Sequence, residues 1–496
     1  MSGQSTQQQK AEPNGRQQNP SEIEIDASNW DAREDSGGWR PSLKILIGAA
    51  LGVVVALLMS AWGWDFEGAA TGGVGATVAF WWLSDAAAPA IPALLPIAAL
   101  PLLGVLSLDD VGAAFGRPVI WLLLGGFAIA LAIQNTGAHR RLALGLVSLV
   151  RRRSDSGAVV VAAFGVTAAL ISMWLVNTAT TVMLVPVALA VCQSLPEEQR
   201  RMMEGPLLLV IAHAATIGGM ATPVGTVPNA LFLQQYELAS GVQWGFVDWM
   251  SYGLPIVLLA LPLLLLFMVR NVRQKAPDIP DVGAWRIEEK VALGALALAA
   301  LIWVTRRQPF GGWSAWLDAT WVSDGVIAIA VALLLFLIRI RGAPILKPAD
   351  VAHLRWDVTL LMVGGLCLAS ALASTGISAV IAEPLKILGT LPTFVLILGI
   401  CLLVTFLTEI SSNTATILLF LPLLASVAAE IGLDPLVLML PAAFSASCAF
   451  MMPVATPPNA IVAGISREAA HMMPRKGIVI NFGMALLISV CIYFLI

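Results

Sequence analysis

Charged residues are scarce in this sequence. Asp, Glu, Lys and Arg make up only 12% of the 496 residues, whereas hydrophobic residues make up 58%. Soluble globular domains carry roughly 25% charged residues, so a single soluble core could not hide this much apolar surface. The net charge of -3 also offers no basic surface suited to nucleic acid, and we expect no nucleic-acid partner.

The sequence also lacks the motifs of catalysis inside a membrane. It contains no HExxH, no GxSxG, no P-loop and no paired aspartates within apolar segments, which disfavours an intramembrane enzyme. The five cysteines lie in apolar stretches and form no CxxC pair, so we expect them to be packing residues rather than metal ligands or disulfides. They are Cys192, Cys367, Cys401, Cys448 and Cys491.

Long apolar runs are what the sequence has in abundance. A membrane-spanning helix needs about 20 apolar residues, and runs of this kind, some of them shorter, recur at Pro41 to Trp62, Ala86 to Leu106, Ile120 to Ile133, Gly205 to Ile217, Leu254 to Val269, Val291 to Val304, Gly325 to Ile338 and Ile478 to Ile496. We predict an all-α, multi-pass protein of the plasma (inner) membrane, surrounded by lipid. The polar residues 1–40 predict a disordered cytoplasmic tail at the N-terminus.

Three short patterns each occur twice in the same order, which divides the chain into two related halves. The first is a Gly-Gly pattern (124–127 and 363–366), the second is Asn-Thr-Ala-Thr (177–180 and 413–416), and the third is Pro-Asn-Ala (228–230 and 458–460). We assign 41–275 to the first half, 276–290 to a cytoplasmic linker and 291–496 to the second half.

The placement of basic residues indicates that the two halves are inverted. Lys and Arg are enriched in loops on the cytoplasmic side. Between the first two patterns, the second half has only Lys386, whereas the first half has Arg140, Arg141, Arg151, Arg152 and Arg153. Matching segments therefore lie on opposite sides of the membrane, as in the inverted repeats of secondary transporters. Arg306 and Arg307 do not fit this rule if the apolar runs beside them both span.

One short apolar run lies within the arginine-rich stretch of the first half. Leu142 to Val150 is too short to span the membrane. We predict an interfacial amphipathic helix there.

Polar and proline residues interrupt the apolar sequence at matching places in both halves. Irregular backbone survives at membrane depth only where it lines a cavity or is buried in protein. The stretches 172–178 and 408–414 place amides and hydroxyls in apolar sequence, and 221–229 and 453–459 contain prolines that a continuous helix does not tolerate. Each half is therefore expected to have a hairpin tip and a broken helix. Amides, hydroxyls and half-helix N-termini would bind an anion, and unwound carbonyls would bind a cation.

The strings Thr408-Glu409, Ser412-Asn413-Thr414 and 455–462 closely resemble the divalent anion sodium symporter family. The resemblance extends over roughly residues 41 to 496. It implies a homodimer with two inverted repeats, re-entrant hairpins, and a scaffold domain past which a transport domain moves like an elevator. It also implies substrate contacts at Asn177, Thr178, Ser412, Asn413, Thr414 and Pro457. Sodium ligands are implied at Ser172, Asn177 and Gly225 for one site, and at Thr408, Ser411, Asn413 and Ala455 for the other.

The first half departs from the family pattern at two positions. Val176 stands where the motif has serine, and Val227-Pro228 replaces a Pro-Pro pair. The expected first sodium site therefore matches the family pattern less closely than the second. Glu409 is an ionisable residue at membrane depth, where we expect either a coupling or gating role or a capping or pairing role near the hairpin end.

The family resemblance implies sodium-coupled symport of four-carbon dicarboxylates such as succinate, malate and fumarate, with Na+ bound at two or more sites. The same amides and hydroxyls that bind a carboxylate would also bind sulfate. A sulfate or inorganic-anion symporter and a sodium-independent dicarboxylate exchanger of the same fold both stay open, as does coupling to protons instead of sodium.

Overall fold

The computed structural model describes residues 41–152, 154–277, 283–307 and 311–496. The predicted cytoplasmic tail (1–40), Arg153 and part of the predicted linker lie outside the described residues. The described chain is almost entirely helical, and its one small sheet pairs the two-residue strands β1 (Arg339–Ile340) and β2 (Ala343–Pro344). Seven of the described helices are long and apolar enough to cross a membrane, and several shorter apolar helices accompany them. These helices confirm the prediction of an all-α, multi-pass membrane protein.

Four helices precede the first copy of the repeat. They are α1 (Pro41–Ala61), α2 (Phe66–Leu83), α3 (Ala90–Leu102) and α4 (Leu108–Phe115). The first copy consists of α5 (Pro118–Thr136), α6 (Ala138–Arg151), α7 (Gly157–Ser172), α8 (Asn177–Cys192), α9 (Glu197–Gly219), α10 (Val227–Ser240) and α11 (Phe246–Val269).

A second group of connecting elements separates the two copies. It contains α12 (Ile287–Thr305), α13 (Gly312–Trp316), α14 (Asp324–Leu337), the two strands and the 3-10 helix η3 (Pro348–His353). The second copy consists of α15 (Trp356–Ser374), α16 (Ile377–Ala382), the 3-10 helix η4 (Glu383–Thr390), α17 (Thr393–Leu407), α18 (Asn413–Glu430), α19 (Pro435–Ser445), α20 (Pro457–Ile465) and α21 (Arg467–Leu495). Helix α12 thus begins four residues before the predicted start of the second half, within the predicted linker.

The order of elements is the same in both copies, and matching residues delimit them. Gly137 follows α5 and Gly376 follows α15, each with a φ of 76° that favours glycine. Asn177 begins α8 and Asn413 begins α18. The breaks before α10 and α20 end where proline enters the first helical turn, a position at which its missing N–H costs nothing.

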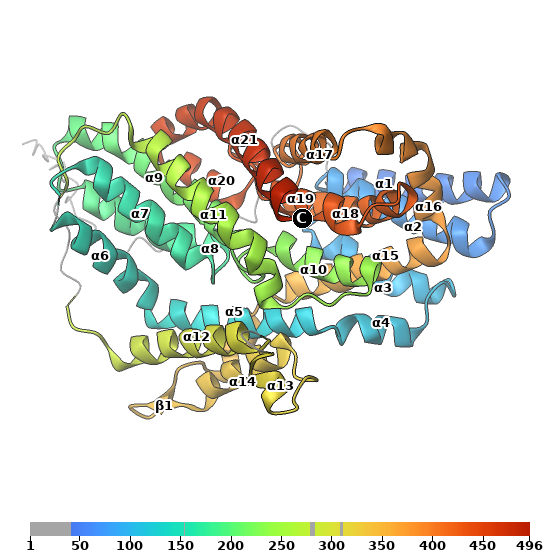
Figure 1. The fold of residues 1–496 in the computed structure, drawn as a ribbon, viewed down its shortest axis with the longest axis horizontal. Helices are drawn as coiled ribbons and strands as arrows, with labels where there is room; N and C mark the ends of the chain where they lie inside the picture. The colour runs from blue at the N-terminus through green and yellow to red at the C-terminus, as the bar shows by residue number, and fades with distance from the viewer. Residues whose placement is uncertain (1–40, 153, 278–282, 308–310) are drawn as a thin grey trace, which may run out of the picture. The chain divides into compact units, whose positions relative to one another are not determined.

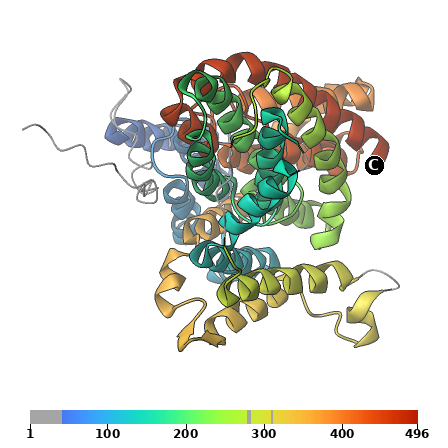
Figure 2. The ribbon, with the colours of Figure 1, turned by 90° about the vertical axis from the view of Figure 1, so that its left-hand side faces the viewer.

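The two halves of the chain are interlocked through the first helix of each copy, α5 and α15. Helix α14, which belongs to the second half, packs along α5, and α3 from the first half packs along α15 (Figure 1). Glycine permits both contacts: a Cβ built on Gly125 would lie 2.5 Å from the carbonyl carbon of Ala328, and one on Gly364 would overlap the backbone of Ala93. Figures 1 and 2 both show α12 and α14, in yellow and ochre, running beside α5.

Candidate functional site

Each copy contains a helical hairpin whose tip carries the predicted binding residues. In the first hairpin α7 ends at Ser172 and α8 begins at Asn177, and in the second α17 ends at Leu407 and α18 begins at Asn413. Neither residue at the N-cap position, Val176 or Ser412, makes a side-chain capping hydrogen bond. The Ser412 hydroxyl is therefore not used to cap its own helix.

Each copy also contains a broken helix that is closed by an asparagine. The side-chain amide of Asn229 donates to the carbonyls of Gly219 and Thr222, at 2.9 and 2.7 Å. In the second copy the amide of Asn459 donates to the carbonyls of Ala449 and Met452, at 2.9 and 3.1 Å. These asparagines belong to the repeated Pro-Asn-Ala pattern, and both are fully buried. Each one satisfies backbone carbonyls that the break leaves without helical partners.

The residues predicted to form the first sodium site lie together. Ser172 Oγ donates to Asn177 Oδ1 at 2.8 Å, which joins the two ends of the hairpin tip. A Cβ built on Gly225 would overlap the carbonyl oxygen of Gly219 and lie 2.9 Å from that of Ser172. One built on Gly219 would overlap Asn177 Oδ1 and lie 3.2 Å from the carbonyl oxygen of Gly225. Four oxygen atoms therefore converge where two residues have no side chain.

This arrangement suits a hard monovalent cation. Carbonyl and amide oxygens are the ligands that unwound membrane helices offer to Na+, and glycine allows these oxygens to approach one another closely. Gly219 is a member of the cluster that sequence reasoning did not select. Its nearness to Asn177 in the fold is what identifies it.

The residues predicted to form the second sodium site are arranged differently. Thr408 Oγ1 donates to the carbonyl of Thr405 at 3.0 Å, and Ser411 Oγ lies 2.7 Å from Thr416 Oγ1. Asn413 Oδ1 is buried without a hydrogen-bond partner among the described residues. A buried acceptor that is left unpaired is costly, so Asn413 is an oxygen that a bound cation or a donor would satisfy. The backbone N–H of Ala455 donates to the carbonyl of Met452.

Glu409 joins the second hairpin to the second broken helix. Its Oε1 accepts the backbone N–H of Met451 and its Oε2 accepts that of Met452, both at 2.8 Å. The side-chain amide of Asn481 in α21 donates to Oε1 at 2.6 Å, and Glu409 is only 4% exposed. The three donors that meet its carboxylate fit the expected capping or pairing role, and a coupling or gating role stays a prediction. Met452 is also bonded by Asn459, so Glu409 is tied to the break that carries Ala455.

The first copy makes the matching connection with uncharged groups. There the hydroxyl of Thr222 donates to the carbonyl of Met173, which occupies the position of Glu409 in the repeat. The hairpin tip and the break are thus joined at equivalent positions in the two copies, by a hydroxyl in the first and by a carboxylate in the second. A carboxylate close to the second hairpin adds negative potential beside that half of the candidate site.

The predicted substrate residues occupy helix N-termini. Asn177 and Thr178 form the first turn of α8, Asn413 and Thr414 the first turn of α18, and all four are half-buried. Pro457 begins α20 and is exposed. Helix α8 packs on α20, and α18 packs on α10, so each hairpin meets the half-helix of the other copy. N-terminal backbone N–H groups and the helix dipole favour an anion at such ends.

The chain is similar to known transporters over nearly its whole described length. Residues 41–495 match the family model described as the sodium:sulfate symporter transmembrane region. The sodium-dependent dicarboxylate transporter SdcS of Staphylococcus saprophyticus is 33% identical over 444 residues, which cover 84% of each chain. SdcS of a Staphylococcus aureus strain is 32% identical over 441 residues, again 84% of each.

A solved structure shares the fold. The crystal structure of the YdaH transporter of Alcanivorax borkumensis, described as having an unusual topology, aligns with a TM-score of 0.57 at 17% sequence identity. The alignment covers 80% of this chain and 89% of that one. At this identity the similarity concerns the fold alone.

Proposed function

Because this chain belongs to the sodium:sulfate symporter family, we propose that it is a secondary active transporter that carries four-carbon dicarboxylates, such as succinate, malate and fumarate, together with Na+. The curated relatives are named as sodium-dependent dicarboxylate transporters. The observation that carries the proposal is the cluster of four oxygen atoms around Gly219 and Gly225, beside a helix that begins with Asn177. This arrangement supports a cation site next to an anion site.

The residues have distinct roles in this proposal. Asn177, Thr178, Ser412, Asn413 and Thr414 donate amide and hydroxyl hydrogens to the two carboxylates, and Pro457 lines the site. Ser172, Asn177 and Gly225 hold one sodium ion, with the carbonyl of Gly219 added by the geometry. Thr408, Ser411, Asn413 and Ala455 hold the other. Glu409 keeps the second break in place through the N–H groups of Met451 and Met452.

Electrostatics explains why cations accompany the anion. Moving one elementary charge against 100 mV costs about 2.3 kcal/mol, so a dianion entering the cell costs about 4.6 kcal/mol. Two sodium ions cancel the charge of the dianion, and a third makes the membrane potential drive uptake. Two or more sodium sites are therefore the expected number.

The proposal extends to assembly and location. Family membership supports a homodimer in the plasma membrane, surrounded by lipid, in which a scaffold domain stays fixed while a transport domain carries the hairpins across. The arginine count supports a cytoplasmic N-terminus and a cytoplasmic α6.

Transport by purified protein in proteoliposomes tests the function. Uptake of labelled succinate and of labelled sulfate is measured with sodium or with choline outside, at an imposed inside-negative potential. We expect sodium-dependent uptake of succinate that unlabelled malate and fumarate inhibit. Uptake of sulfate and not succinate would identify an inorganic-anion symporter. Exchange of succinate that proceeds equally in choline would contradict sodium coupling and identify an exchanger of the same fold.

A further inference from the structure

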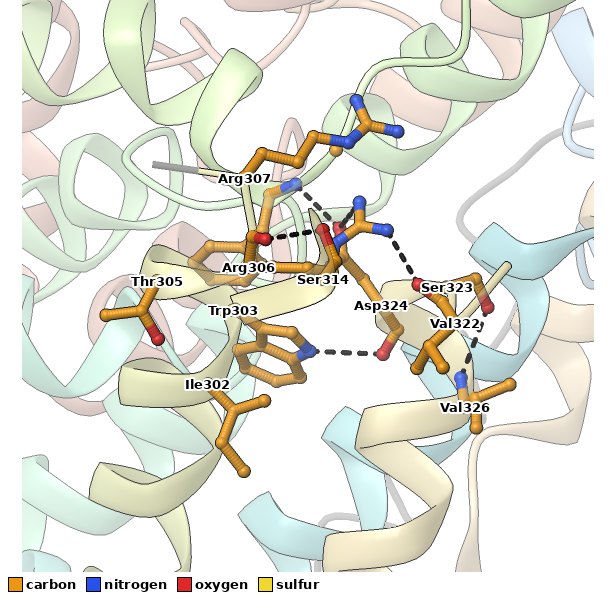
Figure 3. A network of polar contacts seen from close by, with 12 residues as sticks. Ile302, Trp303, Thr305, Arg306, Arg307, Ser314, Val322, Ser323, Asp324 and Val326 are labelled. Carbon is orange, nitrogen blue, oxygen red and sulfur yellow. Dashed lines mark hydrogen bonds and ion pairs between the residues drawn. The ribbon is translucent and has the colours of Figure 1, made fainter. Parts of the chain in front are cut away.

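A buried ion pair lies between the end of α12 and the start of α14. Arg306 Nε is 2.7 Å from Asp324 Oδ1, and both side chains are less than a tenth exposed. The guanidinium also donates to Asp324 Oδ2 at 3.2 Å and to the carbonyl of Val322 at 2.9 Å (Figure 3). A buried charge pair needs further hydrogen bonds to offset the loss of water. Here the carbonyl of Val322 accepts from the guanidinium, whereas Asp324 Oδ1 has only the ion pair among the described residues.

Asp324 also holds the first residue of α11. Its Oδ2 accepts the backbone N–H of Phe246 at 2.8 Å. Nearby, Arg307 donates to the carbonyl of Gln243 at 3.3 Å and lies 3.4 Å from Asp248, which are both residues at or just before the start of α11. Of the two arginines that did not fit the charge rule, Arg307 therefore joins the end of α12 to the start of α11, and Arg306 joins it to Asp324 of α14, which in turn bonds Phe246.

An aromatic stack extends from this ion pair to the first hairpin tip. The ring of Phe246 stacks on Trp303 of α12, with centroids 4.6 Å apart, and on Trp174, with centroids 5.9 Å apart. Trp303 in turn donates from its indole N–H to the carbonyl of Asp324 at 3.0 Å (Figure 3). Trp174 lies in the tip, between Ser172 and Asn177. Phe246 thus links the hairpin tip to the connecting helices through its ring.

The stack lies at the end of α5 remote from the arginine-rich helix α6. Helix α6 follows the C-terminus of α5, and there Arg286, which precedes α12, donates to the carbonyl of Thr136. At the other end of α5, Gly325 packs against Pro118. Since α5 has 19 residues, the two ends are about 28 Å apart. If α6 is cytoplasmic, the ion pair and the stack lie toward the outer face.

We propose that Phe246 is a positioning residue that closes the first hairpin tip from the outer face, and that Asp324 and Arg306 hold it there. The tip then becomes reachable from outside only when Trp174 separates from Phe246. The inference rests on the proposed transport function for its meaning, but not for its test, because accessibility of the tip can be measured without any substrate.

The test measures the rate at which an impermeant thiol reagent labels a cysteine at the tip. Val176→Cys provides that cysteine, and the five native cysteines are all buried. Labelling is compared in right-side-out and in inverted vesicles, in choline buffer. Phe246→Ala removes the ring, and Phe246→Leu keeps apolar volume but removes the stacking. The matched control is Phe232→Ala, which removes an equally buried ring that stacks on Tyr236 instead.

We expect Phe246→Ala and Phe246→Leu to speed labelling from the outside by about fivefold, the scale of one lost aromatic pair, and not to speed labelling from the inside. Asp324→Asn should also speed labelling from the outside. The variant leaves the charge of Arg306 unpaired, so residue 324 holds the backbone of Phe246 less firmly. The control should change neither rate. An increase of equal size from both sides, or an increase as large in Phe232→Ala, would overturn the proposal by showing general loosening of the fold. Unchanged labelling in Phe246→Leu would overturn it as well.

Discussion

Asn229 and Asn459 make the same pair of hydrogen bonds in the two copies of the repeat. The amide of Asn229 bridges the carbonyl of Gly219, the last residue of α9, and that of Thr222 in the break, whereas the amide of Asn459 bridges the carbonyls of Ala449 and Met452, both in the break after α19. The asparagine of the Pro-Asn-Ala pattern is therefore a structural residue that fixes the shape of the unwound segment. The asparagines at the hairpin tips have a different position, at half-buried helix N-termini.

Asn459→Ala should lower stability more than it alters substrate preference. The substitution leaves two buried carbonyls unpaired, at a cost of about 1 to 3 kcal/mol. Thermal unfolding in detergent, followed by size-exclusion chromatography, should show an earlier transition. The surviving protein should keep its order of preference among succinate, malate and sulfate. A changed order with unchanged stability would mean that Asn459 contacts the substrate.

Asn413→Ala should lower transport strongly and leave stability nearly unchanged. Its Oδ1 has no partner among the described residues, so removing it costs little packing, whereas the proposed site loses an oxygen for sodium and a donor for the anion. Transport should fall by at least about fivefold at normal expression and melting temperature. Transport near the wild-type rate would instead make the motif a helix-packing element.

Gly219→Ala should weaken the first sodium site. A Cβ at this position would overlap Asn177 Oδ1, so the amide oxygen must move away from the cluster. The sodium concentration for half-maximal uptake should rise by about tenfold or more, as expected when one oxygen ligand of about 1.4 kcal/mol is displaced. Gly399→Ala is the matched control, because a Cβ there meets no atom within 4 Å. Equal sodium dependence in the two variants would contradict a cation site beside Gly219.

Val176→Ser should strengthen the same site. Val176 offers no oxygen at the N-cap position, whereas Ser412 offers a hydroxyl at the matching position. A regained oxygen contact of about 1 kcal/mol should lower the half-maximal sodium concentration about fivefold. Substrate selectivity should stay nearly the same, because Asn177 and Thr178 are unchanged. A weaker sodium dependence would show that Val176 packs against its neighbours and that the cation binds elsewhere.

Cysteine labelling should place Arg152 and Thr390 on opposite faces of the membrane. Both residues are exposed, and they follow or lie in the matching segments α6 and η4. Arg152→Cys should react with an impermeant reagent only in inverted vesicles, and Thr390→Cys only in right-side-out vesicles. Reaction from one and the same face would disprove the inverted repeat. Arg141 is less suitable for this experiment, since its side chain is largely buried against Glu289.

The sequence predicted the features that are written in local patterns. The hairpin tips before α8 and α18, the breaks before α10 and α20, and the amphipathic segment within α6 all follow from residue type and spacing. Helix α2 was not foreseen, because Phe66–Leu83 is rich in glycine and glycine weakens the helical signal. The closeness of Ser172, Asn177 and Gly225 came from the family resemblance, and local patterns alone did not predict it.

The features that escaped prediction depend on contacts between distant segments. Arg306 could not be explained from its neighbours in the sequence, since its partner Asp324 begins another helix. Asp324 in turn accepts the backbone N–H of Phe246 in a third helix. Glu409 was noticed, but its three donors come from segments more than 40 residues away. Gly219 becomes notable because its missing side chain lies beside Asn177 Oδ1 and the carbonyl oxygen of Gly225, which come from other segments. Such residues become meaningful only when the fold brings their partners together.

The interlocked packing of α3 on α15 and of α14 on α5 has a consequence for biosynthesis. The glycine face of α15, at Gly364, is the surface on which Ala93 of α3 rests. At roughly 5 to 20 residues per second, a ribosome needs on the order of tens of seconds to reach Gly364 after it has made Ala93. Throughout that interval α3 has no permanent neighbour on this face, and lipid or the insertion machinery must occupy it. The first half of the chain is therefore an assembly intermediate that the second half completes.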